Sequence, residues 1–182
     1  MGKWARYRHQ GTGRLVSGPP PLPLLQSGAI DCTADVAFNN GFSRLGNRFG
    51  SSFTGTVERI EATFRRDAAY EPDVRASVWS ADLGTGLPDA LIVQSDPVGF
   101  AEIPTTPIGL SPPVLFPVTP TLLGIGVTYW VVLFAAPAPA ASQLFWGMEV
   151  GTARLARGND VISWFVNNDT TLNCWQLFGQ PS

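Results

Sequence analysis

Short runs of alternating apolar and polar residues, separated by turn residues, fill the chain from Asp31 onward. In the run VERIEATF, Ile60, Ala62 and Phe64 alternate with polar neighbours, as expected for a strand that buries one face. Val57, Ile60 and Phe64 also have a spacing that fits one side of a helix. We predict a strand here and keep the helix as the alternative.

The run VRASVWSA has the same alternation, with Val74, Ala76 and Val78 on one face and Trp79 on the other. The GTGLPD sequence that follows predicts a loop. Seven further runs have the pattern of strands: ALIVQS, PVGFAEI, PVLFPV, VTYWVVLF, LFWGMEV, VISWFV and LNCWQLFG. Nine or ten short strands predict an all-β fold, a jelly-roll-like antiparallel β-sandwich, over residues 31–182. We expect its core to bury Ile60, Phe64, Val78, Tyr129, Val131, Leu133 and Phe178.

Two stretches in the second half of the chain have unusual composition. The segment 103–121 holds six prolines, which cannot donate ladder hydrogen bonds, so we predict an edge strand or a long crossover there. The apolar segment 122–136 lies between Pro120 and Pro137, which leave sixteen residues between them. A membrane-spanning helix needs about 20 residues. We therefore predict a buried strand over 122–136 and no membrane span.

Residues 1–30 differ from the rest of the chain in charge and in proline content. They hold four basic residues and no acidic one, so this segment carries +4, and the remaining 8 basic and 14 acidic residues give −6. Prolines at positions 19, 20, 21 and 23 favour an extended backbone and interrupt the apolar run that a signal peptide would need. We predict an extended arm over residues 1–30, without a signal peptide.

The arm has two interpretations, a solvated tail or a segment that lies along a neighbouring subunit. In the second interpretation, its basic and apolar side chains bind the neighbour: Lys3, Trp4, Arg6, Tyr7, Arg8, Arg14, Leu15, Leu22, Leu24 and Leu25. We favour the second interpretation, because a proline-rich segment loses less backbone freedom when it binds. We then expect a chain without residues 1–28 to fold but not to assemble.

The composition narrows the class of protein. Charged residues make up 14% of the chain, and 19 glycines and 16 prolines disfavour a helical bundle. A hydrophobic content of 45% excludes a fully disordered chain, and a net charge of −2 argues against a general nucleic-acid-binding surface. Few charges and many apolar residues suit a subunit that buries surface in an assembly.

The two cysteines leave two possibilities open. Cys32 and Cys174 lie near opposite ends of the predicted sandwich, where first and last strands often meet, so a disulfide is conceivable. Two free buried thiols are the alternative, and a reducing intracellular origin would favour them. Two cysteines have no zinc-ligand spacing.

Candidate catalytic residues are few. The only histidine, His9, lies in the arm, where a Ser-His-Asp triad could not be held rigid. A glycosidase pair could come from Glu58 with Glu61, which would lie on opposite faces of a strand, or from the acidic residues of 67–73, which suggest a solvated turn. We expect a protein that is not an enzyme and holds no cofactor.

Oxygen ligands for calcium are present in one region of the chain. Asp160 and the run Asn167, Asn168 and Asp169 have suitable side chains, but a hairpin turn explains them equally well. We expect no metal site there.

Aromatic residues at alternate strand positions are usually part of a core. Trp79 is the exception, because it falls opposite the face formed by Val74, Ala76 and Val78. It is therefore the candidate for a surface that stacks against a sugar.

Several sequence pieces, in this order, resemble the β-sandwich modules called choice-of-anchor domains, which occur in exported bacterial proteins and in phage genomes. The resemblance covers Phe49 to Gly179, and its most specific pieces are SVWSADLGTGLP and GVTYWVVL. It implies a sandwich in which Tyr129 and Trp130 anchor a central strand, and it implies no catalytic residues. Exported members begin with a signal peptide and end with an anchoring segment, whereas this chain has the basic, proline-rich arm.

These observations favour a bacteriophage structural protein located in the virion, as a capsid decoration or a tail or fibre subunit. Its partners would be other virion proteins and copies of itself, bound through the arm, with no specific nucleic acid. The alternative is a carbohydrate-binding or adhesion module, in which a glycan binds near Trp79.

Overall fold

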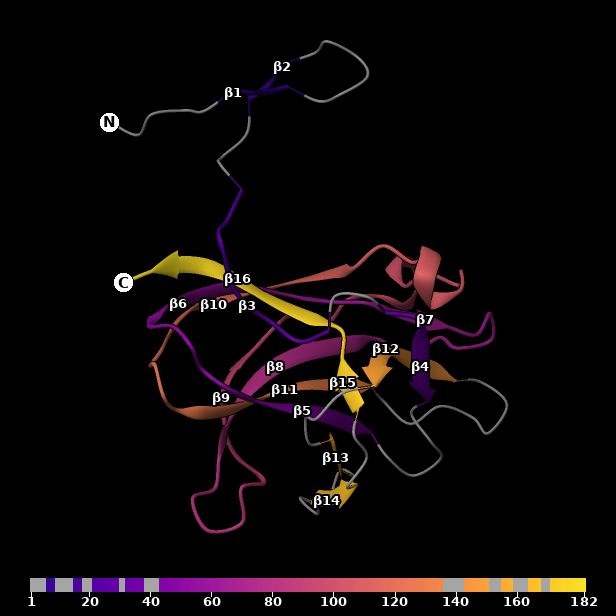
Figure 1. Cartoon of the computed structure of the whole chain (residues 1–182). Helices are drawn as coiled ribbons and strands as arrows, with labels where there is room; N and C mark the ends of the chain where they lie inside the picture. Colours follow the sequence, from indigo (N-terminus) through magenta and orange to yellow (C-terminus); the bar gives the residue numbers. More distant parts are fainter. Residues whose placement is uncertain are drawn as a thin grey trace.

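The computed structural model of the chain describes residues 6–8, 15–17, 21–29, 32–37, 43–135, 143–150, 155–158, 164–167 and 171–182. Apart from two short 3₁₀ helices, the regular structure in these residues is β, and the strands pair antiparallel. Two sheets face each other and enclose the main hydrophobic core (Figure 1). The predicted antiparallel β-sandwich is confirmed.

The strands form two large sheets and two smaller ones. The first large sheet has the order β10 (Val114–Leu123), β6 (Gly55–Ala62), β16 (Trp175–Pro181), β3 (Leu24–Ser27). The second has the order β14 (Trp164–Asn167), β13 (Leu155–Gly158), β5 (Arg44–Gly50), β11 (Thr128–Ala135), β8 (Val74–Ala81), β9 (Pro88–Gln94). The third contains β15 (Thr171–Asn173), β12 (Leu144–Val150) and β4 (Ala34–Ala37), and β7 (Phe64–Arg66) also pairs with β12. The last consists of β1 (Arg6–Arg8) and β2 (Leu15–Ser17).

The local alternation correctly predicted most of the core. Six of the seven expected core side chains are buried: Ile60, Phe64, Val78, Tyr129, Val131 and Leu133. The prediction for Phe178 is wrong, because Leu177 points into the core and Phe178 is half-buried on the outer face of the sheet. There the guanidinium carbon of Arg59 lies 4.5 Å from the centre of the Phe178 ring.

Both strands singled out in the sequence are present. β6 and β7 bury the face of Ile60, Ala62 and Phe64, so the helix alternative over this run is wrong. The GTGLPD loop follows β8, and the Asp82 carboxylate accepts the backbone N–H of Thr85 at 2.6 Å. This hydrogen bond lowers the pKa of Asp82.

One predicted strand, PVGFAEI, is wrong. Only Val98 of this run pairs, in an isolated bridge with Val74 at the start of β8. The chain then turns into the 3₁₀ helix η1 (Phe100–Glu102), in which the N–H of Glu102 donates to the carbonyl of Gly99. The turn, rather than a ladder, satisfies this donor.

The segment 122–136 is not one buried strand but a hairpin. Its first residues end β10, the chain turns at 124–127, and β11 begins at Thr128. Gly126 has φ of +76°, a conformation that residues with a side chain rarely adopt. No helix among the described residues is long and apolar enough to cross a membrane.

The proline-rich segment 103–121 contains an edge strand, as predicted. It passes through the 3₁₀ helix η2 (Ile108–Leu110) and enters β10, which among the described strands pairs only with β6. The register of that pairing shifts between Pro117 and Thr121, around the prolines that cannot donate a hydrogen bond.

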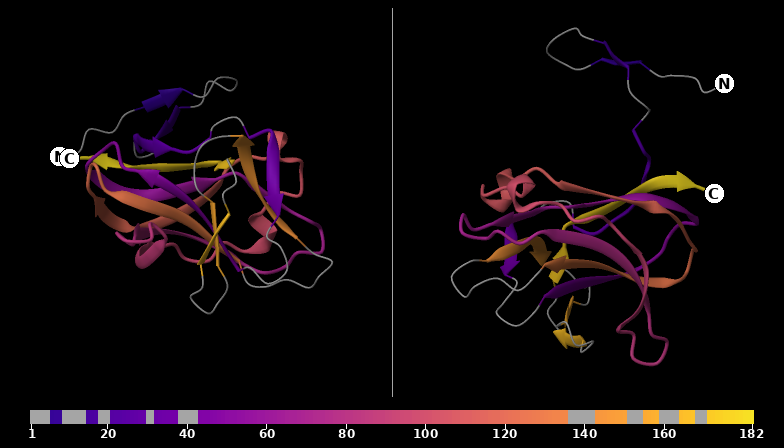
Figure 2. Two further views of the ribbon diagram at one scale, coloured as in Figure 1. Left: turned by 60° about the horizontal axis from the view of Figure 1, so that its bottom comes forward. Right: turned by 180° about the vertical axis from the view of Figure 1, so that it is seen from behind.

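The N-terminal segment has two parts with different structural roles. Strand β3 pairs with β16, and the N–H groups of Gly28 and Ala29 donate to the carbonyls of Trp175 and Asn173. A Cβ at Gly28 would collide with the Trp175 indole, so this close approach requires glycine. Strands β1 and β2 pair only with each other among the described strands. They lie away from the sandwich, beyond the sheet formed by β10, β6, β16 and β3 (Figures 1 and 2).

Candidate functional site

The residues predicted to contact a neighbouring subunit do not form one group. Lys3, Trp4 and Arg14 lie outside the described residues. Strand β1 consists of Arg6, Tyr7 and Arg8, and Leu15 begins β2.

Three of the four leucines of the expected arm lie close to the sandwich or within it. Leu22 is half-buried, and Leu24 in β3 is 51% exposed. Leu25 packs against the main core. Leu25 therefore contributes to this chain's own core, and Leu24 presents an apolar side chain to the surface.

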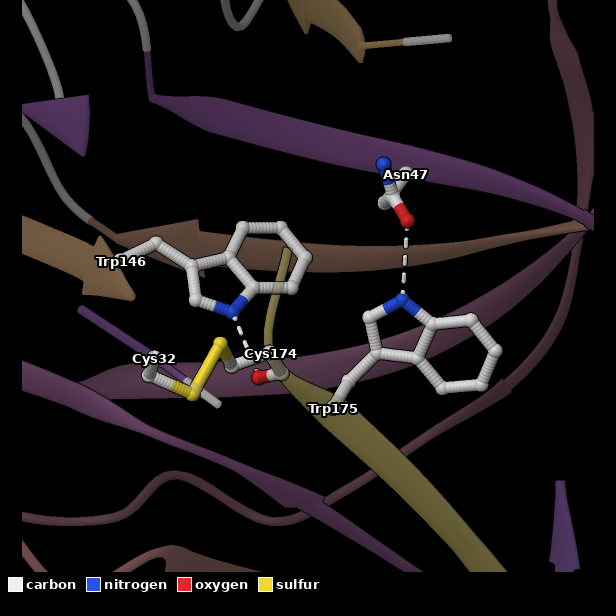
Figure 3. Close-up of a disulfide and its surroundings, with 5 residues drawn as sticks. All are labelled: Cys32, Asn47, Trp146, Cys174 and Trp175. Atoms are coloured by element: carbon white, nitrogen blue, oxygen red, sulfur yellow. Dashed lines mark hydrogen bonds between the residues drawn. A yellow bond between two sulfur atoms is a disulfide. The ribbon is translucent and has the colours of Figure 1, made fainter. Parts of the chain in front are cut away.

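The two cysteines form a disulfide, so the alternative of two free thiols is wrong (Figure 3). Cys32 follows β3, and Cys174 lies between β15 and β16. The carbonyl of Cys174 accepts a hydrogen bond from Nε1 of Trp146 at 3.0 Å. Nε1 of the buried Trp175 donates to Oδ1 of Asn47, also at 3.0 Å. The bridge thus holds the start of the sandwich to its last strands.

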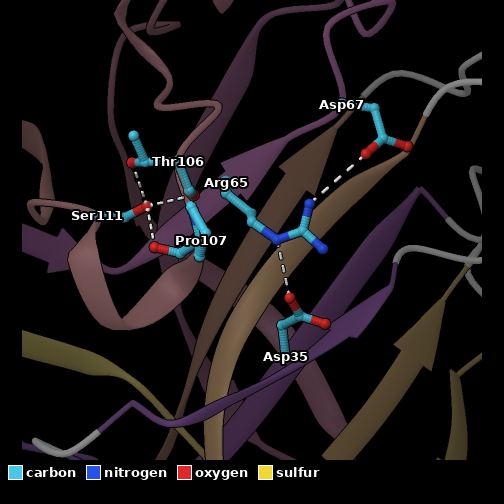
Figure 4. Close-up of polar contacts among 6 residues, drawn as sticks. All are labelled: Asp35, Arg65, Asp67, Thr106, Pro107 and Ser111. Carbon is cyan, nitrogen blue, oxygen red and sulfur yellow. Dashed lines mark hydrogen bonds and ion pairs between the residues drawn. The ribbon is translucent and has the colours of Figure 1, made fainter.

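A polar cluster beside β7 has a structural role (Figure 4). Nε of Arg65 donates to Asp35 at 2.9 Å, and Nη1 of Arg65 lies 3.6 Å from Asp67. Arg65 also stacks over the ring of Phe145, 3.8 Å from its centre. These contacts join β4, β7 and β12. The charged groups of the cluster are therefore paired with one another within the protein.

Glu61 is the most buried of the acidic residues weighed for catalysis. It is 8% exposed and forms an ion pair with Arg59 at 2.8 Å. It lines a groove of about 620 Å³ beside the disulfide. Glu71 and Asp73 are exposed. Each carboxylate therefore has its own environment, and none of these environments resembles a matched acid and base pair.

Metal ligands do not gather in the described part of the chain. No group of three or more His, Cys, Asp or Glu side chains there could hold a metal ion. His9, Asp160, Asn168 and Asp169 lie outside the described residues, and Asn167 ends β14.

Trp79 lies on the outer face of the six-stranded sheet, as predicted, and lines a cavity of about 280 Å³. We call this the outer-face cavity. Its lining also includes Arg44, Arg75, Ser77, Leu91, Gln94 and Phe134. The residues come from β5, β8, β9 and β11, four adjacent strands of one sheet.

Cross-strand pairing determines the layout of the outer-face cavity. Phe134 on β11 lies opposite Arg44 on β5 and opposite Arg75 on β8, so an arginine flanks it on each side. Further along β8, Trp79 lies opposite Leu91 on β9. Between these two rows, the smaller Ser77 occupies β8. Large side chains thus surround a shallow centre.

Trp79 is held by protein contacts and is not a free-standing aromatic ring. Its Nε1 donates to Oγ of Ser77 at 2.9 Å, and Trp164 meets it edge-on with ring centres 5.9 Å apart. Trp130 and Val132 are fully buried beside it, in a second cluster separate from the main core. Strand β14, which carries Trp164, is four places from β8 in the sheet order, so this contact joins strands that are not neighbours in the sheet.

The sequence identified Trp79 but missed the arginines and Phe134. Their only signal was their position in the alternation, since Arg75 alternates with the core residues Val74 and Ala76. Alternation predicts which face of a strand a residue lies on, but not which strand lies beside it. No family model matches the chain, and no curated protein matches it. The resemblance to choice-of-anchor domains stays a prediction.

Proposed function

We propose that this protein is a structural subunit of a bacteriophage particle, with the sandwich as its body and residues 1–20 as the segment that joins it to its neighbours. The observation that carries this proposal is the division at the N-terminus. Strand β3 belongs to the sandwich, whereas β1 and β2 pair only with each other among the described strands. A segment that precedes a sandwich in this way is available for contacts with another subunit.

Charge supports association between copies. All four basic residues of the arm precede position 20, and the rest of the chain carries −6. Opposite charges accelerate association and favour one orientation over others. Exposed charge pairs are screened by salt, so the association should weaken as ionic strength rises.

The disulfide supports a working environment outside a reducing cytoplasm. Disulfides persist on virion surfaces, on cell surfaces and in secreted proteins. The Cys32–Cys174 bridge is therefore compatible with a particle that leaves its host.

The test compares the full chain with a chain that lacks residues 1–20. Sedimentation velocity should find oligomers of the full chain at low salt, fewer oligomers at high salt, and a folded monomer for the truncated chain. Mass spectrometry of purified particles, from a culture whose phage encodes the protein, should detect it. The proposal is wrong if the truncated chain assembles as well as the full chain.

A carbohydrate-binding or adhesion module is the second candidate, and the outer-face cavity favours it. Sugar-binding sites need a concave surface, an aromatic or apolar wall and a few polar groups. Trp79, Leu91 and Gln94 supply these features in one place. Glycan binding by the full chain that is lost in Trp79→Ala, with unchanged thermal stability, would support this candidate.

A further inference from the structure

The outer-face cavity carries an excess of positive charge. Arg44 and Arg75 line it, and none of the described residues that line it is acidic. Both arginines are only partly buried, so their guanidinium groups can be reached from solvent.

Arg44 is positioned by aromatic rings. Its guanidinium carbon lies 5.5 Å from the centre of the Trp79 ring and 5.6 Å from that of the Phe134 ring. Cation–π attraction to aromatic rings orients a guanidinium group without using its N–H donors in hydrogen bonds. Among the described residues, no carboxylate lies within ion-pair distance of Arg44.

Arg75 adds a second guanidinium group to the same cavity. It lies on β8, opposite Phe134 and on the other side of it from Arg44. The described part of the chain supplies it with no ion pair either. Two other arginines do have such partners, since Arg59 pairs with Glu61 and Arg65 with Asp35.

We propose that the outer-face cavity binds a sugar that carries a carboxylate, such as a hexuronate unit of a surface glycan. The carboxylate accepts hydrogen bonds from Arg44 and Arg75, whose planar donors match its two oxygens. The apolar side of the sugar ring packs against Trp79 and Leu91, and the Gln94 amide forms hydrogen bonds with the hydroxyl groups of the sugar. This inference rests on the second candidate function, glycan binding, and is independent of the arm.

A neutral sugar lacks the group that would use the two arginines. It keeps the apolar contact and the amide hydrogen bonds, but it leaves both guanidinium groups with solvent as their partner. We therefore expect the acidic sugar to bind about a hundredfold more tightly than its neutral counterpart, which is the scale of two charge-assisted hydrogen bonds.

The test titrates the full chain with methyl glucuronide and with methyl glucoside, which differ only at the carboxylate. Isothermal titration calorimetry measures the affinities, and tryptophan fluorescence reports events near Trp79. The variants are Arg44→Gln and Arg75→Gln, each expected to weaken methyl glucuronide binding about tenfold while leaving methyl glucoside binding unchanged. Arg48→Gln is the matched control, because Arg48 lies on β5 outside the lining of the cavity.

Four results would overturn the inference, and they separate it from the function on which it rests. Equal binding of both glycosides would support the glycan-binding function but reject the preference for a sugar that carries a carboxylate. Binding of neither at tens of millimolar would reject both. If Arg48→Gln lost as much methyl glucuronide affinity as Arg75→Gln, the effect would come from the overall charge of the protein and not from the cavity. Unchanged methyl glucuronide binding in both cavity variants, with their thermal stability intact, would place the sugar elsewhere.

Discussion

Two neighbouring parts of the N-terminal segment share proline, glycine and apolar residues but have different structural roles. Residues 1–20 and residues 21–29 both contain proline, glycine and apolar residues. Strand β3 in the second part pairs with β16 and packs Leu25 on the core, while β1 and β2 in the first part pair only with each other among the described strands. The comparison teaches that contact with the last strand, and not the content of proline or apolar residues, decides which residues belong to the sandwich.

The largest expected effect comes from moving a truncation across this boundary. Removing residues 1–28 deletes β3, its hydrogen bonds with β16 and the Leu25 contact, which should cost about 5 kcal/mol of unfolding free energy. Removing residues 1–20 should leave the unfolding free energy unchanged. Chemical denaturation of both chains measures the difference. Equal stability would mean that β3 is no more part of the sandwich than β1 and β2 are.

This expectation differs from the sequence interpretation, in which a chain without residues 1–28 still folds well. Composition assigned residues 21–28 to the arm, but the structure pairs 24–27 with β16. The informative truncation for assembly is therefore the one at residue 20.

The disulfide should have the next largest effect. It joins positions 142 residues apart, and a disulfide typically contributes about 3 kcal/mol of stability. Replacing Cys32 and Cys174 by serine should lower the melting temperature, and a reductant should do the same to the original chain. The chain without residues 1–20 is the control and should respond equally to the reductant. A melting temperature that stays the same after the serine substitutions and after reduction would show that the bridge adds no stability.

A pair of leucine substitutions sharpens the comparison within β3. Leu25→Ala removes a side chain that packs against the core and should cost about 2 kcal/mol. Leu24→Ala removes a side chain that is 51% exposed and should change stability by less than about 0.5 kcal/mol. Thermal unfolding compares the two variants directly. A larger loss for Leu24→Ala would reverse the assigned orientation of the strand.

The last prediction concerns Gln26, whose side chain links β3 to the opposite sheet. Its amide nitrogen donates to the carbonyl of Gly50 at 2.8 Å, and its amide oxygen accepts the N–H of Ser52 at 3.0 Å. Gln26→Ala should cost about 1 kcal/mol and speed hydrogen exchange at the Ser52 amide. Gln180→Ala, at an exposed position of β16, is the control. Unchanged exchange at Ser52 would contradict the link.

The sequence by itself determined the strands and the faces they bury, because alternation is a local property of the extended backbone. That is why the core positions Ile60, Phe64 and Val78 and the outward position of Trp79 followed from it. The same locality explains the errors at 97–103 and 122–136. In both segments, apolar composition concealed a turn.

Only the tertiary structure decided which strands became neighbours. Cys32 meets Cys174, and β3 meets β16, across most of the length of the chain. The outer-face cavity arises in the same way, since Arg44 and Arg75 flank Phe134 only because β5, β11 and β8 are adjacent. The physical reason is that strand order depends on the packing of the whole core, a sum over many distant contacts that no local pattern contains.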